Sequence, residues 1–143
     1  MKTVGLASDH AGYPLKEVLK KYLVKFGYET VDFGTHSTES MDYPDTAHPL
    51  AKAVENGEVD WGLAMCGTGN GMAISLNKHQ KIRAGLAWSV DIGKLVKQHN
   101  NANVLVLPAR FITEYQAKRI VKAFIETEFE GGRHQRRIDK IPC

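Results

Sequence analysis

Cys66-Gly67-Thr68-Gly69-Asn70-Gly71 stands between an apolar run at residues 61–65, typical of a buried strand, and a helix-like run at residues 72–78. Glycine lets the backbone turn sharply and bring its N–H groups close to a ligand. The N-terminus of a helix adds unpaired donors and a positive dipole end, so anions are favoured there. The same field favours a thiolate over a thiol. The stretch therefore predicts a strand–turn–helix unit that places a potential base or nucleophile beside an anion-binding loop.

Apolar runs typical of buried strands alternate along the whole chain with segments whose apolar residues recur every three or four positions. The expected strands cover residues 2–8, 28–33, 59–65, 82–87 and 103–107. The expected helices lie at about residues 12–26, 47–54, 72–78, 89–99 and 113–125. Proline in a first turn (Pro14), glycine after a last turn (Gly27 and Gly57), a capping serine (Ser89) and a capping box at residues 113–116 mark their ends.

Strict alternation predicts an α/β fold in which a five-stranded parallel sheet is covered on both faces. Right-handed crossovers then give a doubly wound, three-layer, Rossmann-like sandwich. With strand order 2-1-3-4-5, the chain reverses direction between the first and third strands, and ligands bind at that switch. Asp9-His10 follows the first strand and Cys66 ends the third. We therefore expect these residues to meet in the crevice at the carboxyl ends of the strands.

The chain has 143 residues, 43% of them hydrophobic and 24% charged, which suits one soluble globular domain, residues 1–143. Two cysteines without a zinc or C-x-x-C pattern, and no signal-peptide core or bilayer-spanning run, predict a cytoplasmic protein without membrane association. Basic residues crowd a C-terminal tail at about residues 129–143, although the net charge is only +3. Without a repeated basic stripe or interleaved aromatics, the tail favours a small phosphate or an acidic surface over nucleic acid.

Each of these features also has a plainer interpretation. Cys66 is alternatively a small buried apolar residue, and Thr68 a residue that satisfies loop backbone groups. Asp9-His10 is alternatively a helix cap followed by a surface histidine. The glycine loop matches neither G-x-G-x-x-G nor the Walker pattern, and Asp32 is a weak candidate for a ribose-binding acid, so a dinucleotide site is poorly supported. Three further histidines lack metal-ligand spacing and are assigned to surface or loop positions: His36, His48 and His79.

His99 follows the fourth expected helix and precedes the fifth strand, so it lies at the opposite end of the sheet from Cys66. Arg133 and Arg137, spaced i and i+4, follow the fifth helix and start from the same end; on a helix they would share one face, as a phosphate fork requires. If these residues serve catalysis, a neighbouring subunit is the simplest way to complete the site. We therefore predict a homodimer with shared sites. The alternative is that His99 ends a helix and the arginines belong to a solvated tail.

Five motifs, in order, resemble the sugar-phosphate isomerase family that contains ribose-5-phosphate isomerase type B and the galactose-6-phosphate isomerase subunits. The resemblance covers nearly the whole chain, and Cys66 stands where the type B enzymes have their catalytic base. One local departure is Pro108, where the family more often has glycine. The motifs are Ser8-Asp9-His10-Ala11-Gly12, Asp42-Tyr43-Pro44, Cys66-Gly67-Thr68-Gly69-Asn70-Gly71, His99-Asn100-Asn101-Ala102-Asn103-Val104-Leu105 and Glu130-Gly131-Gly132-Arg133-His134-Gln135-Arg136-Arg137.

The resemblance implies interconversion of ribose 5-phosphate and ribulose 5-phosphate in the pentose phosphate pathway, through an enediolate and without a cofactor or metal. It implies Cys66 as the base, His99 as the ring-opening acid/base, and assistance from Thr68 and Asp9. The substrate-binding residues that it implies are Ser8, Asp9, His10, Gly67, Thr68, Gly69, Asn70, Gly71, Asn100, Arg110, Arg133 and Arg137.

Three alternatives to this function remain open. The sugar could carry six carbons, as in allose 6-phosphate. The chain could be a non-catalytic module that binds nucleotides or sugar phosphates, or Cys66 could have a thiol redox role with Cys143 as its partner. The dimers could also pair into tetramers.

Overall fold

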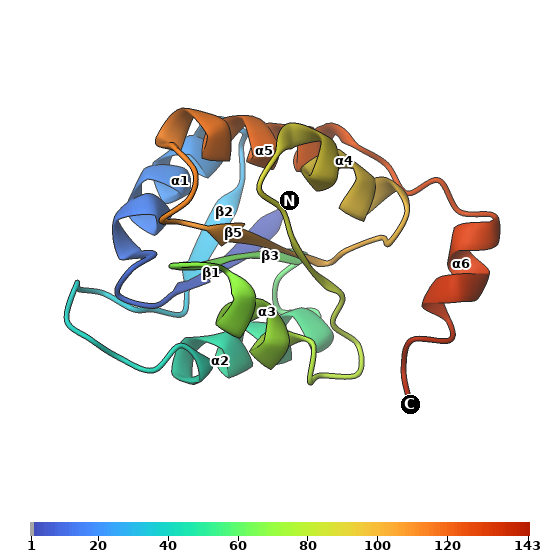
Figure 1. Cartoon of the computed structure of the whole chain (residues 1–143), viewed down its shortest axis with the longest axis horizontal. Coiled ribbons are helices and arrows are strands. Elements are labelled where there is room, and N and C mark those ends of the chain that lie inside the picture. Colours follow the sequence, from blue (N-terminus) through green and yellow to red (C-terminus); the bar gives the residue numbers. More distant parts are fainter. Residues whose placement is uncertain (1) are drawn as a thin grey trace.

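The computed structural model describes residues 2–143, which form a five-stranded, entirely parallel sheet between two layers of helices (Figure 1). The strands are β1 Thr3–Ser8, β2 Glu29–Asp32, β3 Trp61–Cys66, β4 Ala84–Leu86 and β5 Val104–Pro108. The helices are α1 Tyr13–Lys25, α2 Pro44–Glu55, α3 Asn70–Leu76, α4 Val90–Gln98, α5 Glu114–Glu126 and α6 Arg133–Ile138. Within residues 2–143, no helix combines the length and the apolar character needed to cross a membrane.

The strand order is β2-β1-β3-β5-β4, so the predicted order 2-1-3-4-5 is wrong at its far end. All five residues of β5 are buried, and the strand pairs with β3 on one side and β4 on the other. The three-residue β4 is only partly buried, as an edge strand can be. The switch between β1 and β3 is as expected, so the predicted position of the ligand crevice is unchanged.

The two faces of the sheet carry separate hydrophobic clusters, as a sheet covered on both sides requires. On one face, leucines of α1 and the apolar stripe of α5 pack on β1, β3 and β5, with α4 beside α5. On the other face, α2 and α3 cover the sheet. Helix α6 belongs to neither layer and stands at one end of the molecule (Figure 1).

The helix boundaries follow the signals in the sequence. Pro14 is in the first turn of α1, and Gly27 follows its last turn with φ +85°. Ser89 caps α4 by accepting a hydrogen bond from the Ile92 amide, and Thr113 and Gln116 form the predicted capping box of α5. Three helices differ from expectation: α2 begins earlier, at Pro44; α3 begins at Asn70, so Gly71 lies in its first turn; and part of the predicted tail is the helix α6.

A buried lysine ties α1 to the end of β2. Lys16 is 0% exposed, and its Nζ donates to Asp32 Oδ1 at 2.5 Å and to the Thr35 carbonyl at 2.7 Å. Lys20 Nζ donates to the other Asp32 oxygen at 2.8 Å. Burial raises the pKa of the Asp32 carboxyl, but the hydrogen bonds from Lys16, Lys20 and the Gly34 amide outweigh it, so the net pKa is lowered. Both carboxylate oxygens of Asp32 therefore pair with lysines, which argues against Asp32 as a ligand of a ribose.

Replacing Asp32 with asparagine should destabilise the fold, because it leaves the buried Lys16 charge without its partner. We expect a loss of about 3 kcal/mol at pH 7. Since the folded pKa of Asp32 lies below its ordinary value of 3.8, its contribution is present above that value and is lost as the pH falls through the folded pKa. Urea unfolding of wild type and Asp32→Asn between pH 7 and pH 3 measures this difference.

Glu17→Gln is the matched control, because Glu17 pairs with the same Lys20 at the surface. It should change the unfolding free energy by about 0.5 kcal/mol or less. A difference between wild type and Asp32→Asn that stays constant down to pH 3 would contradict this account of the ion pair.

Candidate active site

The ends of β1 and β3 bring three of the predicted site residues together. The Asp9 amide donates to the Met65 carbonyl at 3.3 Å, which joins the two strand ends directly. Ser8 and Cys66 are buried there, and Ser8 Oγ has no hydrogen-bond partner within residues 2–143. Gly12 permits this approach, because a Cβ at that position would lie 2.5 Å from the Met65 carbonyl oxygen. The crevice predicted from the topology therefore contains a thiol, a carboxylate and an unsatisfied hydroxyl.

Asp9 and His10 both make structural contacts in this crevice. Asp9 Oδ1 accepts a hydrogen bond from the Gly12 amide at 2.9 Å and so closes the turn before α1, whose N-cap residue is Gly12 and not Asp9. His10 is half-buried, and its Nδ1 accepts from the Met41 amide at 3.2 Å. That bond makes His10 a constrained residue at the base of the 34–43 loop, so the interpretation as a free surface histidine is wrong.

The glycine loop leaves a set of backbone donors open. Gly69 adopts the left-handed φ of +78°, and a Cβ there would lie 2.3 Å from a Leu86 methyl carbon. The Asn70 amide donates to Thr68 Oγ1 at 3.2 Å, as the plainer interpretation of Thr68 expected. Within residues 2–143, the amides of Thr68, Gly69 and Gly71 donate no hydrogen bond. Open amides beside the Cys66 thiol have the composition of an oxyanion hole.

Two side chains from other segments line the same loop. The Arg110 amide donates to the Gly67 carbonyl at 3.0 Å, and the Arg110 side chain lies against Gly67. Pro108, where the family more often has glycine, is the last residue of β5 and pairs with Cys66. The proline does not move Arg110 away from the glycine loop. The Tyr43 ring covers Gly71, where a Cβ would lie 2.5 Å from a ring carbon. Sequence reasoning gave Tyr43 no role, although it lies in a motif of the family resemblance.

A second group of predicted residues gathers at the junction of α4 and α6. His99 is the C-cap residue of α4, and with Asn100 and Arg137 it lines a cavity of about 350 Å³. His134 lines the same cavity; its ring stacks on that of His99 with centroids 4.4 Å apart and planes 12° from parallel. Sequence reasoning missed His134, and its only signal was its position beside Arg133 in the tail motif. Arg133 itself is exposed, with Nη1 3.9 Å from Glu130 Oε1.

The two groups lie at opposite ends of β5. His99 precedes the first residue of β5, Val104, by five positions, whereas Cys66 pairs with the last residue, Pro108. The strand alone spans about 13 Å at 3.3 Å per residue. His99 and Arg137 are therefore far from Cys66 within one chain. The helix directions predicted this separation.

Among residues 2–143, one group of side chains has the spacing of a possible metal site. One ligand atom from each of His99, Glu130 and His134 lies within 4.8 Å of the others. The lone pair of an imidazole nitrogen lies in the plane of its ring, so two stacked rings direct their lone pairs along separate parallel planes. A tetrahedral metal needs lone pairs that converge. The observed arrangement is therefore a ring stack and not a preformed metal site.

His48 and His79 are also closer than the sequence suggested. His48 Nδ1 lies 2.7 Å from His79 Nε2, and His79 Nδ1 lies 3.3 Å from Glu55 Oε1. His79 lies in the turn after α3, as the assignment to a loop expected, whereas His48 is a half-buried residue of α2 that contacts it. His36 is exposed, as expected.

Comparison with known proteins identifies the family. The ribose/galactose isomerase family matches residues 4–141. The chain belongs to this family. A ribose-5-phosphate isomerase B of Escherichia coli (strain K12) is 43% identical over 141 residues, covering 99% of this chain and 95% of the relative. The resemblance inferred from the motifs is therefore confirmed.

Solved structures of the ribose/galactose isomerase family share the whole fold. A ribose 5-phosphate isomerase of Thermotoga maritima is 48% identical with a TM-score of 0.96, covering 99% of this chain and 97% of that one. A ribose-5-phosphate isomerase B of Mycoplasma genitalium, solved with bound ribulose-5-phosphate, is 42% identical with a TM-score of 0.92, covering 97% and 93%. The five-stranded parallel α/β architecture is thus the fold of the isomerase family.

Gly69→Ala should disrupt this isomerase loop more than an equally strained glycine elsewhere. Gly57 has a similar φ of +74° but open space around its Cα, so Gly57→Ala is the matched control. Gly57→Ala should cost about 1–2 kcal/mol for the left-handed backbone alone. Gly69→Ala should cost about 1–3 kcal/mol more, because its Cβ would displace the Leu86 methyl group and press on the Leu107 carbonyl oxygen of the backbone at 3.3 Å. Thermal unfolding of both variants measures the difference, and equal losses would contradict the packing argument.

Proposed function

We propose that the chain interconverts ribose 5-phosphate and ribulose 5-phosphate, with Cys66 as the base. The observation that carries the proposal is the buried Cys66 thiol at the end of β3, beside the open amides of Thr68, Gly69 and Gly71. The names of the relatives support the same pair of sugars, and one was solved with ribulose-5-phosphate bound. This reaction would place the protein in the pentose phosphate pathway.

The isomerisation moves one proton between neighbouring carbons. The Cys66 thiolate takes the proton from C2 of the open aldose, and the electrons of that bond form the C1–C2 double bond of an enediolate. The proton then returns from the Cys66 thiol to C1, and the proton of the C2 hydroxyl moves to the C1 oxygen, so that C2 becomes the ketone and C1 carries a hydroxyl. The negative charge that develops on the oxygen meets the open loop amides, each worth about 3–4 kcal/mol in a transition state. Thr68 assists proton movement at the sugar oxygens.

The aldose exists mostly as a closed furanose, so the ring must open before C2 can react. The hydroxyl on C1 loses its proton as the C1 carbonyl forms, the bond from C1 to the ring oxygen breaks, and that oxygen gains a proton. We assign these transfers to His99, assisted by Asp9. We propose that four basic residues bind the phosphate: His10, Arg110, Arg133 and Arg137. We propose that Ser8 and Asn100 bind sugar oxygens.

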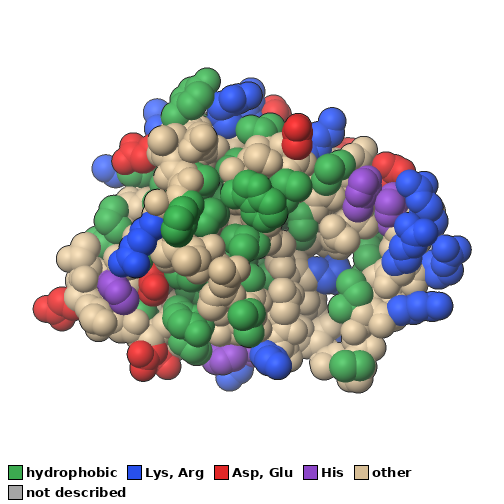
Figure 2. All heavy atoms as spheres, in the orientation of Figure 1, with side chains coloured by type: hydrophobic (Ala, Val, Ile, Leu, Met, Phe, Trp, Pro, Cys, Tyr) green, Lys and Arg blue, Asp and Glu red, His purple; other side chains and the backbone are tan. Residues whose placement is uncertain are grey.

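A second copy of the chain would unite the Cys66 end with the His99 end. Large hydrophobic side chains are exposed near the carboxyl ends of the strands, including Trp88 at 57% and Phe111 at 71% exposed. Figure 2 shows hydrophobic side chains gathered on the face that carries α3 and the segment between β4 and α4, and basic side chains at the α6 end. In a homodimer that buries this apolar face, the α6 end of each subunit would lie beside the Cys66 group of the other, which would give two complete sites. Such dimers could pair into tetramers.

We also propose that residues 1–143 act as one isomerase domain in the cytoplasm. The base role needs Cys66 as a free thiol, which a reducing compartment maintains. Both cysteines are free in the structure, with Cys66 buried and Cys143 exposed. Proton transfer through an enediolate needs no redox cofactor.

Cys66→Ala should abolish turnover of ribose 5-phosphate while leaving the fold intact, because alanine fills most of the site but cannot accept a proton. Cys143→Ala is the control, since it removes the other thiol at the exposed end of the chain. We expect a loss of at least about 1,000-fold for Cys66→Ala, the scale of removing a catalytic base, and none for Cys143→Ala. Turnover and solvent-deuterium incorporation are measured with ribose 5-phosphate, in EDTA, with allose 6-phosphate as competitor.

Three other outcomes would change the proposal. Substantial activity in Cys66→Ala would remove the base assignment. A preference for allose 6-phosphate would keep the mechanism and change the substrate. No turnover of either sugar by the wild type would favour a non-catalytic sugar-phosphate-binding module.

Mixing two variants tests the shared site: Cys66→Ala, which lacks the base, and Arg137→Ala, which should lose turnover at low substrate concentration because a phosphate ligand is missing. A heterodimer of Cys66→Ala and Arg137→Ala would contain one site with both defects and one site with neither, if each site combines residues of both subunits. Random exchange of subunits should then restore about one quarter of wild-type activity. The same mixture with Arg136→Ala in place of Arg137→Ala is the control, because Arg136 does not line the cavity with His99 and this variant should be active alone. No recovery in the first mixture would place each site within one chain.

A further inference from the structure

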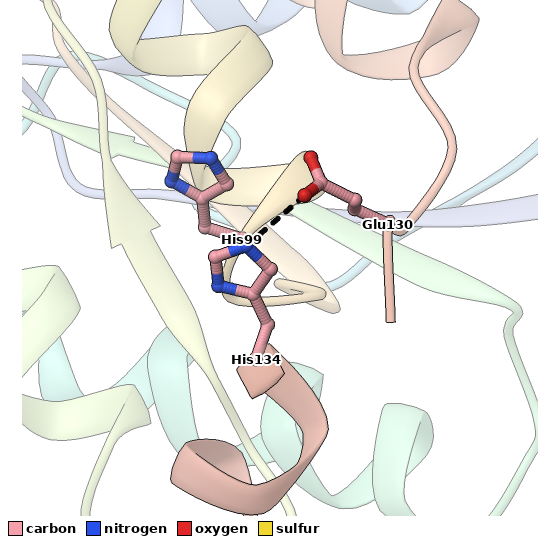
Figure 3. A group of neighbouring side chains, drawn as sticks. All are labelled: His99, Glu130 and His134. Carbon is pink, nitrogen blue, oxygen red and sulfur yellow. Dashed lines mark ion pairs between the residues drawn. The ribbon is translucent and has the colours of Figure 1, made fainter. Parts of the chain in front are cut away.

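The rings of His99 and His134 stack on each other (Figure 3). The proposed reaction assigns no function to His134. His134 is only 7% exposed, and its Nε2 has no hydrogen-bond partner within residues 2–143. That nitrogen lies 3.4 Å from Glu130 Oε1, the ion pair drawn in Figure 3. Burying a polar ring without a full set of hydrogen bonds is costly. An arrangement that places such a ring flat against His99 therefore calls for a functional explanation.

The backbone around residue 130 holds the stack in place. The Glu130 amide donates to the Gln98 carbonyl at 3.0 Å, one residue before His99, so the tail is anchored to the end of α4. Gly131 and Gly132 then adopt positive φ values of +73° and +59°, which fold the chain back into α6. Because of this turn, Glu130 and His134 both face His99. The two glycines thus allow a left-handed turn that residues with a Cβ rarely adopt.

His134 also docks α6 on the body of the protein. His134 and Ile138 are the two buried residues of α6, whereas its arginines are exposed. Arg137, one turn after His134, lines the same cavity as His99. Docking of α6, and with it the position of Arg137, thus depends on two buried side chains, and a leucine in place of His134 still supplies an apolar one.

The stack restricts what the half-buried His99 ring can do. One broad face of the imidazole is covered by His134, so the ring is held in one plane, and its two nitrogens point along that plane. Asn100 and Arg137 line the same cavity as His99. Proton transfer needs the acid/base group close to a fixed direction, and a misplacement of about 1 Å can cost 100-fold in rate.

We propose that His134 is a positioning residue, whose flat ring holds the imidazole of His99 in the orientation that furanose ring opening requires. The inference rests on the proposed function, in which His99 opens the ring. It gives the Glu130-Gly131-Gly132 turn a purpose, namely to seat His134 under His99. Glu130 Oε1 lies 3.4 Å from His134 Nε2, at the edge of the same stack.

The experiment separates ring opening from proton transfer by using two sugars. Ribulose 5-phosphate cannot close into a furanose, because its 5-oxygen carries the phosphate, so exchange of its C1 proton with deuterated water needs Cys66 but no ring opening. His134→Leu should lower turnover of ribose 5-phosphate by about 10- to 100-fold, while the exchange into ribulose 5-phosphate changes by less than about 3-fold. His134→Phe keeps a flat ring and should retain turnover within about 3-fold, on the premise that stacking is the essential contact.

Two further variants serve as a positive and a negative control. His99→Asn should show the same selective loss more deeply, and His36→Leu, which alters an exposed histidine, should change neither rate. Equal losses of turnover and exchange in His134→Leu would mean that His134 serves only to dock α6, and the proposal would fall. Equal turnover in His134→Leu and wild type would also overturn it.

A measurement without turnover tests the positioning of the His99 ring separately from the proposed function. In proton NMR, the His99 ring signals of the wild type should carry the ring-current shift of a stacked neighbour, and His134→Leu should lose that shift and broaden. An unchanged, sharp His99 signal in His134→Leu would overturn the positioning role. If the wild type turned over no sugar phosphate while the NMR change appeared, the proposed function would fail and the positioning of His99 would stand.

Discussion

The parallel pairing of β1 with β3 is the constraint on which the rest of the structure depends. Its register sets Ser8 opposite Met65, so the residues that follow each strand emerge side by side. Because both strands are buried on both faces, this register is fixed by the apolar packing of two helical layers and not by the residues of the site. Chemistry at the ends of β1 and β3 is thus supported by two strands packed between helical layers.

The same winding that assembles the Cys66 group separates it from His99. In a parallel sheet every crossover helix returns the chain to the amino-terminal end, so a residue after a helix lies at the opposite end from a residue after a strand. His99 and Arg137 follow α4 and α5, so both lie at the end of the sheet opposite Cys66. This separation is what makes a second subunit part of the proposed site, and it is consistent with an apolar face near the carboxyl ends of the strands.

Local signals in the sequence identified most elements because each depends on neighbours in the chain. The Thr113 capping box, the glycine after α1 and the apolar stripe of α5 all act within a few residues. The strand order could not be obtained in this way. Whether β4 or β5 lies next to β3 depends on which of two apolar runs can be buried on both faces and paired at both edges. That is a comparison between distant segments, and β5, with five buried residues, takes the inner position.

The sequence by itself determined the alternating α/β fold, the family and the residue types of the site, since hydrophobic periodicity and the glycine loop are read from adjacent positions. Only the tertiary structure decided which partners these residues have. Asp32 is engaged by Lys16 and Lys20, the Tyr43 ring covers the glycine loop, and His134 stacks on His99. These contacts join segments far apart in the chain, and their distances follow from how the helical layers pack and not from any local pattern.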